Sequence, residues 1–224
     1  MSENKSVIIV GAGPAGIGVA RELNRDFVVF EAENSLGGLM RSKNIHGYTF
    51  DWAGHIFFTK IQRIKSLVEE LMADNFHWQD RESWVFSKDT FTRYPFQGNT
   101  FGLPLPVVKD CLMGLIDATY KDWPGDPQNF QEWIHQTYGQ GIADHFMIPY
   151  NEKLWATDLS KMDHLWLAGR VPRPGLSEFI DGALGPGRKD MGPNARFGYP
   201  LTGGTQDVAE RLAAPVSNGI QLNS

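Results

Sequence analysis

The sequence predicts an α/β fold, and three observations carry that prediction. Residues 6–10 form a short, continuous apolar run, which is typical of a strand buried in a parallel sheet. A glycine-rich turn and a helical stretch at 15–24 follow, and a second apolar run at 27–30 ends at an acid. A long helical pattern then fills residues 105–184. We therefore expect a Rossmann-like βαβ unit with a right-handed crossover, which carries a helical insertion.

Composition narrows the class of protein. The chain has 224 residues, of which 42% are hydrophobic, enough for one large domain or two small ones. A net charge of -5 does not favour a nucleic-acid partner. The single cysteine, Cys111, rules out an intramolecular disulfide, fits a reducing compartment and is expected in the core. Glycines and Pro14 interrupt the apolar stretch 6–20, so we expect no signal peptide, no membrane segment and a cytoplasmic location.

Further elements follow from periodicity and turn signals. An amphipathic helix is expected at 61–72, with Ile61, Ile64, Leu67, Val68 and Leu71 on one face, and a β-hairpin at 83–96 around Lys88-Asp89. Between 105 and 184, helices are expected at 107–120, at 130–138 with Asn129 as cap, and at 141–156, 161–169 and 177–184. A loop at 185–193, a strand at 196–200, a helix at 205–213 and a strand at 220–222 complete the chain.

These elements predict three regions. Residues 1–104 would form a dinucleotide-binding region with the hairpin, and residues 105–185 a helical insertion for the substrate. Residues 186–224 would return to the nucleotide-binding sheet.

The turn after the first strand reads Gly11-Ala12-Gly13-Pro14-Ala15-Gly16. The first glycine makes the tight turn, the second lets the backbone approach a pyrophosphate, and the third lets the helix pack on the strand. Alone, such a pattern also fits an ordinary glycine-rich turn. Here Glu31 ends the next strand 20 positions after Gly11 (31 − 11), as expected for a carboxylate on the adenosine ribose. The pyrophosphate would lie at the helix N-terminus. The glycine turn and Glu31 together therefore predict a dinucleotide site.

A second close backbone approach, Gly37-Gly38-Leu39-Met40-Arg41, follows the ribose acid and favours FAD over NAD. With this segment the sequence resembles the flavoprotein superfamily that includes amine oxidases and protoporphyrinogen oxidase. The resemblance implies FAD contacts from a set of residues along the first third of the chain. The set is Gly11, Gly13, Ala15, Gly16, Glu31, Ala32, Gly38, Leu39, Arg41, Gly54 and His55.

Four further segments narrow the resemblance to UDP-galactopyranose mutases of the eukaryotic type. They are residues 48–57 around His55, residues 94–97 (Tyr-Pro-Phe-Gln), residues 147–156 with the following 166–170, and residues 192–197. One departure is Ala53-Gly54, where family members commonly carry two glycines. Outside this context, His55 fits a loop histidine, Trp155 a core residue and Arg170 a surface arginine.

The resemblance also implies roles for individual residues. His55 would lie beside the flavin, and Arg170 would meet the diphosphate, so these two are the expected catalytic residues. Tyr94, Phe96 and Gln97 would hold the uracil end of the substrate, since an aromatic platform and an amide suit a pyrimidine. Asn151 and Trp155, four apart on a helix, would line the cleft, and Asn194 would close on the substrate from a loop. No metal site is expected.

The implied activity is that of an isomerase: ring contraction of UDP-galactopyranose to UDP-galactofuranose through N5 of reduced FAD, with NAD(P)H as reductant. The partner would be a nucleotide sugar, with no nucleic acid and no membrane. Mutases continue beyond the length seen here, so we expect a fold that is incomplete at the C-terminus. Its exposed sheet edge would need a missing portion or a homo-oligomer to cover it.

Two other interpretations stay open. The chain could be an amine-oxidase-type FAD-dependent oxidoreductase that acts on another substrate. It could also be an inactive remnant that binds ADP or FAD without turnover.

Overall fold

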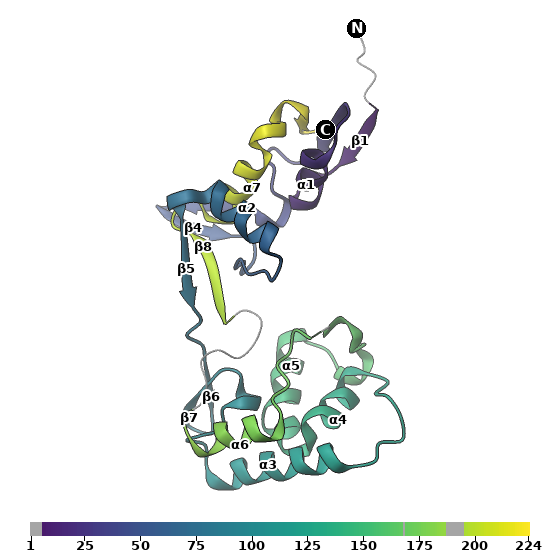
Figure 1. Cartoon of the computed structure of the whole chain (residues 1–224), viewed down its shortest axis with the longest axis vertical. Helices are drawn as coiled ribbons and strands as arrows, with labels where there is room; N and C mark the ends of the chain where they lie inside the picture. Colours follow the sequence, from purple (N-terminus) through teal and green to yellow (C-terminus); the bar gives the residue numbers. More distant parts are fainter. Residues whose placement is uncertain (1–5, 168, 187–194) are drawn as a thin grey trace. The chain divides into compact units, whose positions relative to one another are not determined.

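The computed structural model describes residues 6–167, 169–186 and 195–224, and the chain divides into two compact units (Figure 1). The first unit is Met1–Gln79 with Arg196–Ser224, and the second is Asp80–Ala195. The β-hairpin therefore belongs to the second unit with the helices, whereas the sequence division at residue 104 placed it with the nucleotide-binding region.

The predicted βαβ unit opens the first unit. Strand β1 (Val7–Val10) leads through the glycine turn into helix α1 (Pro14–Glu22) and strand β2 (Phe27–Glu31). The two strands pair in parallel, with Val7 opposite Phe27. Apolar side chains of both strands pack with the buried Ala20 of α1, because a parallel sheet needs a helix on its face. The α/β fold class is confirmed.

Strand β9 (Ile220–Leu222) joins β2 in parallel, which gives the sheet order β1-β2-β9. Strand β1 thus has a strand neighbour on one side only within the described part of the chain. On this strand Ile8 is 64% exposed and Val10 is 87% exposed. An apolar edge and an uncovered apolar face are unusual for a parallel sheet, and they match the expected open edge.

The remainder of the first unit packs beside this sheet. Helix α2 (Gln62–Met72) buries Val68 and Met72 against Val208 of helix α7 (Gly204–Ala213), whereas the predicted face residue Ile61 is exposed because it precedes the helix. The other elements are η1 (Gly38–Met40), β3 (Ser42–Ile45), β4 (Tyr48–Asp51), η2 (Ala73–Asn75), β5 (Phe76–Asp80), β8 (Arg196–Pro200) and η7 (Ala214–Gly219). Strands β3 and β4 form an antiparallel hairpin, and β5 pairs with β8.

The second unit has its core between helices. Helix α3 (Leu105–Tyr120) lies against α4 (Phe130–Ile142), and Gly114 meets Gly139 and Gly141 where a side chain would collide with backbone. The predicted cap of α4 is confirmed, since Oδ1 of Asn129 accepts a 2.9 Å hydrogen bond from the Glu132 N–H. The other elements are β6 (Trp84–Ser87), β7 (Thr90–Arg93), η3 (Phe96–Gly98), η4 (Ala143–Met147), α5 (Ile148–Trp155), η5 (Leu159–Lys161), η6 (Leu165–Leu167) and α6 (Leu176–Leu184).

Two expected helices differ from the structure, and one expected loop lies mostly beyond the described residues. The helix expected at 161–169 is wrong: η5 and η6 are separate 3₁₀ turns, because the Asp158 and Asp163 carboxylates accept nearby backbone N–H groups and compete with a helix. The helix expected at 141–156 contains a π-helical turn, η4, before Pro149, which has no N–H to donate. The loop expected at 185–193 lies mostly outside the described residues.

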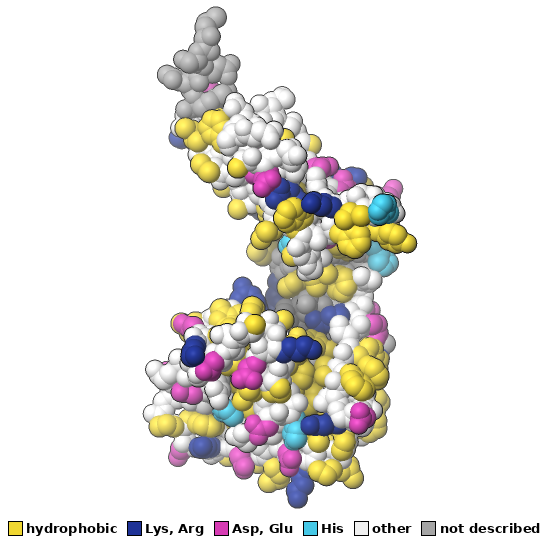
Figure 2. Space-filling view, turned by 180° about the vertical axis from the view of Figure 1, so that it is seen from behind, with side chains coloured by type: hydrophobic (Ala, Val, Ile, Leu, Met, Phe, Trp, Pro, Cys, Tyr) yellow, Lys and Arg dark blue, Asp and Glu magenta, His cyan; other side chains and the backbone are white. Residues whose placement is uncertain are grey.

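The surface carries hydrophobic side chains among charges of both signs on each unit (Figure 2). No helix in the described ranges has the length and apolarity needed to cross a membrane. Cys111 is buried as expected, and burial raises the pKa of its thiol to about 12.

Candidate functional site

The glycine turn of the first unit leaves backbone exposed where a side chain would block it. Gly11 has a φ of 95°, which favours glycine, and its N–H donates to the Phe30 carbonyl at 2.7 Å. Gly13 precedes α1 as its N-cap without a capping side chain. A Cβ on Gly16 would collide with the Gly11 carbonyl oxygen. The N–H groups of the first helical turn therefore have no side-chain cap, as an anion site requires.

The second glycine pair lies directly against this turn. The Gly37 N–H donates to the Ala12 carbonyl at 2.8 Å, and Gly37 and Gly38 have φ values of 110° and 55°. A Cβ on Gly38 would come within 3.2 Å of the Gly13 Cα. The two turns form a cradle of bare backbone, here named the glycine cradle and defined by residues 11–16 and 37–38.

Glu31 ends β2 beside the cradle. Its Oε2 accepts from the Ala12 N–H at 2.7 Å and its Oε1 from the Glu33 N–H at 3.0 Å. The hydrogen bond from Glu33 lowers the pKa of the Glu31 carboxyl, and the bond from Ala12 and the charge of Arg41 add to this effect against desolvation. The buried carboxylate is thus ionised at neutral pH, and each oxygen keeps a lone pair for a ligand hydroxyl.

Arg41 is held over the second turn by three contacts. Its Nε donates to the Gly38 carbonyl at 3.0 Å, its guanidinium pairs with Glu33 at 3.0 Å, and it stacks on the Trp52 ring at 4.6 Å. Several other predicted cofactor residues lie at the surface of the first unit. They are Ala15, Ala32, Leu39 and Gly54.

Asp51 forms a network that sequence reasoning missed. Its Oδ1 accepts from the Ser42 hydroxyl at 2.6 Å and from the Thr205 N–H at the start of α7, and its Oδ2 accepts from the Tyr199 hydroxyl at 2.6 Å. Burial opposes ionisation of Asp51, but these hydrogen bonds outweigh it and lower the pKa. Burial and this carboxylate raise the pKa of Tyr199 to about 12. The only sequence signal was an acid at the end of a strand.

His55 follows this network in the segment between β4 and α2. Its Nδ1 is buried and has no hydrogen-bond partner among the described residues. The residue lines a mainly apolar pocket of about 190 Å³ with Met40, Ile56, Phe57, Phe76, Gly198, Tyr199, Pro200, Thr205 and Val208. Two backbone hydrogen bonds between Phe57 and Gly198, of 2.9 and 2.8 Å, anchor the segment. A buried polar atom without a partner, on a residue that lines an apolar pocket, marks His55 as a candidate for ligand contact.

The predicted uracil-binding residues lie in the second unit. The Arg81 guanidinium stacks on the Tyr94 ring at 4.3 Å, and burial raises the pKa of Tyr94. Phe96 is fully buried, and its ring stacks on Phe146 at 4.7 Å, so its side chain supports the site from the core. Gln97 is also buried.

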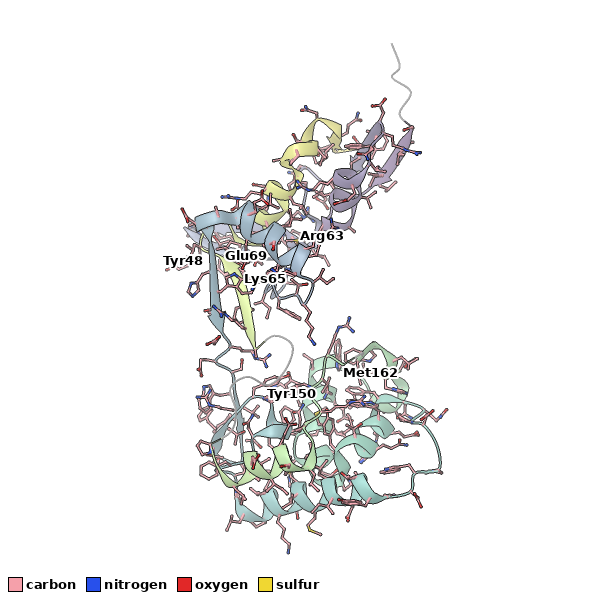
Figure 3. All side chains as sticks on the ribbon, in the orientation of Figure 1. Tyr48, Arg63, Lys65, Glu69, Tyr150 and Met162 are labelled. Carbon is pink, nitrogen blue, oxygen red and sulfur yellow. The ribbon has the colours of Figure 1, made fainter. Side chains whose placement is uncertain are left out.

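One predicted cleft residue of α5, Trp155, and the predicted Arg170 both contact Trp166. Trp155 makes an edge contact with Trp166 at 5.2 Å, and the Arg170 guanidinium donates to the Trp166 carbonyl at 2.6 Å. Asn151 is buried, and its Nδ2 donates to the Met147 carbonyl one turn back. Tyr150 on the same helix is labelled in Figure 3, and its ring stacks on Phe146.

Two residues of this region were missed from the sequence and one prediction falls outside it. Arg81 carried no signal beyond its residue type, whereas Trp166 lay in the segment 166–170 that carried the resemblance but had no role assigned to it. Asn194 lies outside the described residues. The roles assigned to all these site residues stay predictions.

Known proteins match this chain in sequence and in fold. Residues 9–71 match the family described as "NAD(P)-binding Rossmann-like domain". A putrescine oxidase of Kocuria rosea is 31% identical over 150 residues, which cover 59% of this chain and 31% of that protein. A coproporphyrinogen III oxidase of Staphylococcus aureus is 25% identical over 210 residues, which cover 83% of this chain and 43% of that protein.

A solved structure extends the match over nearly the whole chain. The crystal structure of a reduced UDP-galactopyranose mutase superposes with a TM-score of 0.90 at 32% identity and covers 99% of this chain and 49% of that one. The chain thus spans half or less of the length of these relatives. Residues 9–71 thus match a NAD(P)-binding Rossmann-like domain, and the chain as a whole is similar in fold to UDP-galactopyranose mutase, as the sequence resemblance predicted.

Proposed function

We propose that this chain forms the FAD-binding and uridine-binding part of a UDP-galactopyranose mutase, which converts UDP-galactopyranose to UDP-galactofuranose. The observation that carries the proposal is the glycine cradle with the ionised Glu31 beside it, in a chain similar to a mutase over 99% of its length. The chain spans 49% of that mutase, so the proposal concerns a protein that includes the equivalent of the other half.

The residues of the first unit fit FAD. A Cβ on Gly38 would come within 3.2 Å of the Gly13 Cα, so the two turns lie close together and can present backbone to a pyrophosphate. Glu31 offers ionised oxygens to ribose hydroxyls. His55 lines the apolar pocket and has an unpartnered Nδ1, so we assign it to the edge of the flavin ring. When bound, reduced FAD supplies the nucleophile for the ring contraction, which involves no net redox change.

In the second unit, we assign Tyr94 and Gln97 to the uracil and Asn151, Trp155 and Arg170 to the remainder of the nucleotide sugar. Arg170 suits the diphosphate because a planar guanidinium binds two oxygens at once. Trp166 acts through these residues as a positioning residue, since it contacts Trp155 and holds the Arg170 guanidinium by its carbonyl. Asn194 is proposed to contact the substrate as well.

NAD(P)H is the proposed reductant of the flavin. A cytoplasmic location is proposed on the sequence's single cysteine, Cys111, which is buried. A homo-oligomer or the remaining portion of the mutase is proposed to cover β1.

An amine-oxidase-type reaction is the second candidate, and the 31% identity with a putrescine oxidase over 150 residues favours it. It would oxidise an amine and consume oxygen without prior reduction of the protein. A third candidate, an ADP- or FAD-binding remnant, would bind a nucleotide without turnover.

Three measurements separate these candidates. If the chain is part of a mutase, the purified protein should be yellow. UDP and UDP-galactose should raise the melting temperature of its dithionite-reduced form, and putrescine should cause no oxygen uptake. Oxygen uptake with an amine would reject the mutase proposal and support the amine-oxidase candidate. A colourless protein that rejects added FAD, or a reduced protein with no thermal shift from UDP, would contradict the proposal.

A further inference from the structure

We infer that the second unit carries a saccharide-binding pocket beside the loop between α3 and α4, with Trp123 as its stacking platform. The pocket is a cavity of about 600 Å³, within the range of about 300–1,000 Å³ that is usual for small-molecule sites. The loop after α3, the middle of α4 and the segment 164–173 bound it. Among the described residues, none that we assign to FAD or to the nucleotide sugar lines this pocket, so the inference does not depend on the proposed function.

The indole ring of Trp123 is fixed by contacts close to it in the chain. Its Nε1 donates to the Ala118 carbonyl at 3.1 Å, and the Lys121 ammonium lies over the ring at 4.2 Å from its centroid. Trp123 lines both this pocket and a smaller cavity of about 370 Å³, whereas Lys121 lines only the smaller one. The ring therefore turns toward the larger pocket a face that Lys121 does not cover. A ring that is already immobile loses little freedom when a ligand stacks on it.

Side chains also hold the backbone of this loop. The Gln136 Nε2 of α4 donates to the Gly125 carbonyl at 3.3 Å, and the Gln128 Nε2 donates to the Asp126 carbonyl at 2.8 Å. These two bonds fix the loop on the stretch where the Asp126 side chain enters the pocket lining. The pocket thus exists before a ligand arrives, as is usual for small-molecule sites.

Several polar side chains of the lining are available to a ligand. Those of Asp126, Thr137 and His164 make no hydrogen bond or ion pair within the described part of the chain. Arg173 also lines the pocket, and its guanidinium is oriented by stacking on the Trp133 ring at 4.6 Å. The carboxylate accepts hydrogen bonds, the guanidinium donates them, and the hydroxyl and the imidazole can do either.

This lining suits a neutral saccharide. Its described residues include one carboxylate, Asp126, and one guanidinium, Arg173, and these opposite charges favour neither a phosphate nor a diamine. A sugar ring has an apolar face of C–H groups, which stacks on an indole, and a rim of hydroxyls that donate and accept hydrogen bonds. The free face of Trp123 matches the first feature, and the donors and acceptors around it match the second.

The test is saturation-transfer NMR on the full chain with methyl β-galactopyranoside, lactose and maltotriose as probes. At least one probe should receive magnetisation from the protein, with a dissociation constant on the order of 1 mM, because an open site with one platform binds weakly. Saturating UDP should leave the signal unchanged. No transfer to any of the three probes, or loss of the signal on addition of UDP, would overturn the inference.

Two variants locate the binding. Trp123→Ala removes the platform and should weaken saccharide binding about tenfold, as expected for the loss of one stacking contact. Asp126→Ala removes one acceptor from an exposed loop position and should weaken it about fivefold. Because Asp126 is exposed, this second variant keeps the test valid if Trp123→Ala lowers the melting temperature of the chain.

Trp84→Ala is the matched control. Trp84 lies in the same unit, is 51% exposed and carries the Arg93 guanidinium over its ring at 4.6 Å, but it does not line the pocket. This variant should keep the affinity of the unmodified chain. Equal losses in Trp84→Ala and Trp123→Ala, or unchanged binding in Asp126→Ala, would overturn the inference. A mutase assay that fails while saccharide binding persists would reject the proposed function and leave this pocket standing.

Discussion

The hydroxyl of Tyr199 donates a 2.6 Å hydrogen bond to Asp51, which lies 148 residues earlier in the chain. This bond ties the end of β4 to β8, next to the backbone pair of Phe57 and Gly198 that anchors the His55 segment. The segment proposed to lie beside the flavin is thus held at both of its ends by one strand.

Removing this hydrogen bond should weaken the first unit. Tyr199→Phe is expected to lower the free energy of unfolding by about 1.5–3 kcal/mol, since a hydrogen bond to a charged group is lost. Because the pKa of Asp51 is lowered in the folded state, its contribution is complete above its unfolded pKa and is lost as the pH falls through the folded value. Urea unfolding between neutral and acid pH measures both effects.

Tyr48→Phe is the control for Tyr199→Phe, because Tyr48 is exposed in the same unit. The Tyr48→Phe substitution should change the free energy of unfolding by no more than about 0.5 kcal/mol relative to the unmodified chain. Equal effects of the two variants, or a loss for Tyr199→Phe that grows on acidification, would contradict the account.

Glu31 should matter to nucleotide binding and to stability at once. In Glu31→Gln an NH₂ group faces one of the two backbone N–H donors, so we expect a loss of about 1–3 kcal/mol of stability and weaker FAD binding. Titration of FAD fluorescence measures the affinity. Glu33→Gln, which breaks an ion pair whose carboxylate side chain is 57% exposed, should change stability by about 1 kcal/mol or less. A larger effect at Glu33 than at Glu31 would reject the role of Glu31.

Two glycines of α1 should respond in opposite directions. Gly18→Ala places a Cβ in open space within a helix and is expected to stabilise the protein by about 0.5–1 kcal/mol. Gly16→Ala drives a Cβ into the Gly11 carbonyl and should destabilise the protein and reduce FAD binding. Thermal melts with and without FAD test the pair, and a stabilising Gly16→Ala would show that the helix does not pack as described.

The open edge of β1 predicts self-association. The chain should form dimers or larger species as its concentration rises, because unpaired strand edges pair with other chains. Val10→Lys should reduce this association in sedimentation velocity, whereas Val19→Lys, at an exposed apolar position on α1, should not. A chain that stays monomeric, or equal effects of both lysines, would count against the edge as the contact.

Local signals predicted the parts of the fold that lie close together in sequence. The continuous apolar runs of β1 and β2, the glycines between them and Glu31 after them specified the βαβ unit, because each follows from chain geometry over a few residues. Asn129 caps α4 as predicted. The predicted hairpin turns at Lys88 and Asp89, which both have the positive φ that such a turn requires.

Features that depend on distant segments were not predictable in this way. Strand β5 was missed because its partner β8 lies more than a hundred residues later in the chain. For the same reason, the sequence around Asp51 did not indicate its hydrogen bond with Tyr199. The helix expected at 161–169 failed because Asp158 and Asp163 take backbone N–H groups locally. Likewise, no pattern indicates that Gln97 is held by the carbonyl of Pro172.

The most direct test of the central claim is a turnover assay with UDP-galactofuranose after dithionite reduction. It should be run on this chain and on the chain supplied with the remaining half of a mutase, with product separated by anion-exchange chromatography. We expect UDP-galactopyranose from the reduced, completed protein, none from the oxidised protein, and a strong loss of product in Arg170→Ala. No UDP-galactopyranose from a reduced, completed protein that has bound FAD would contradict this expectation.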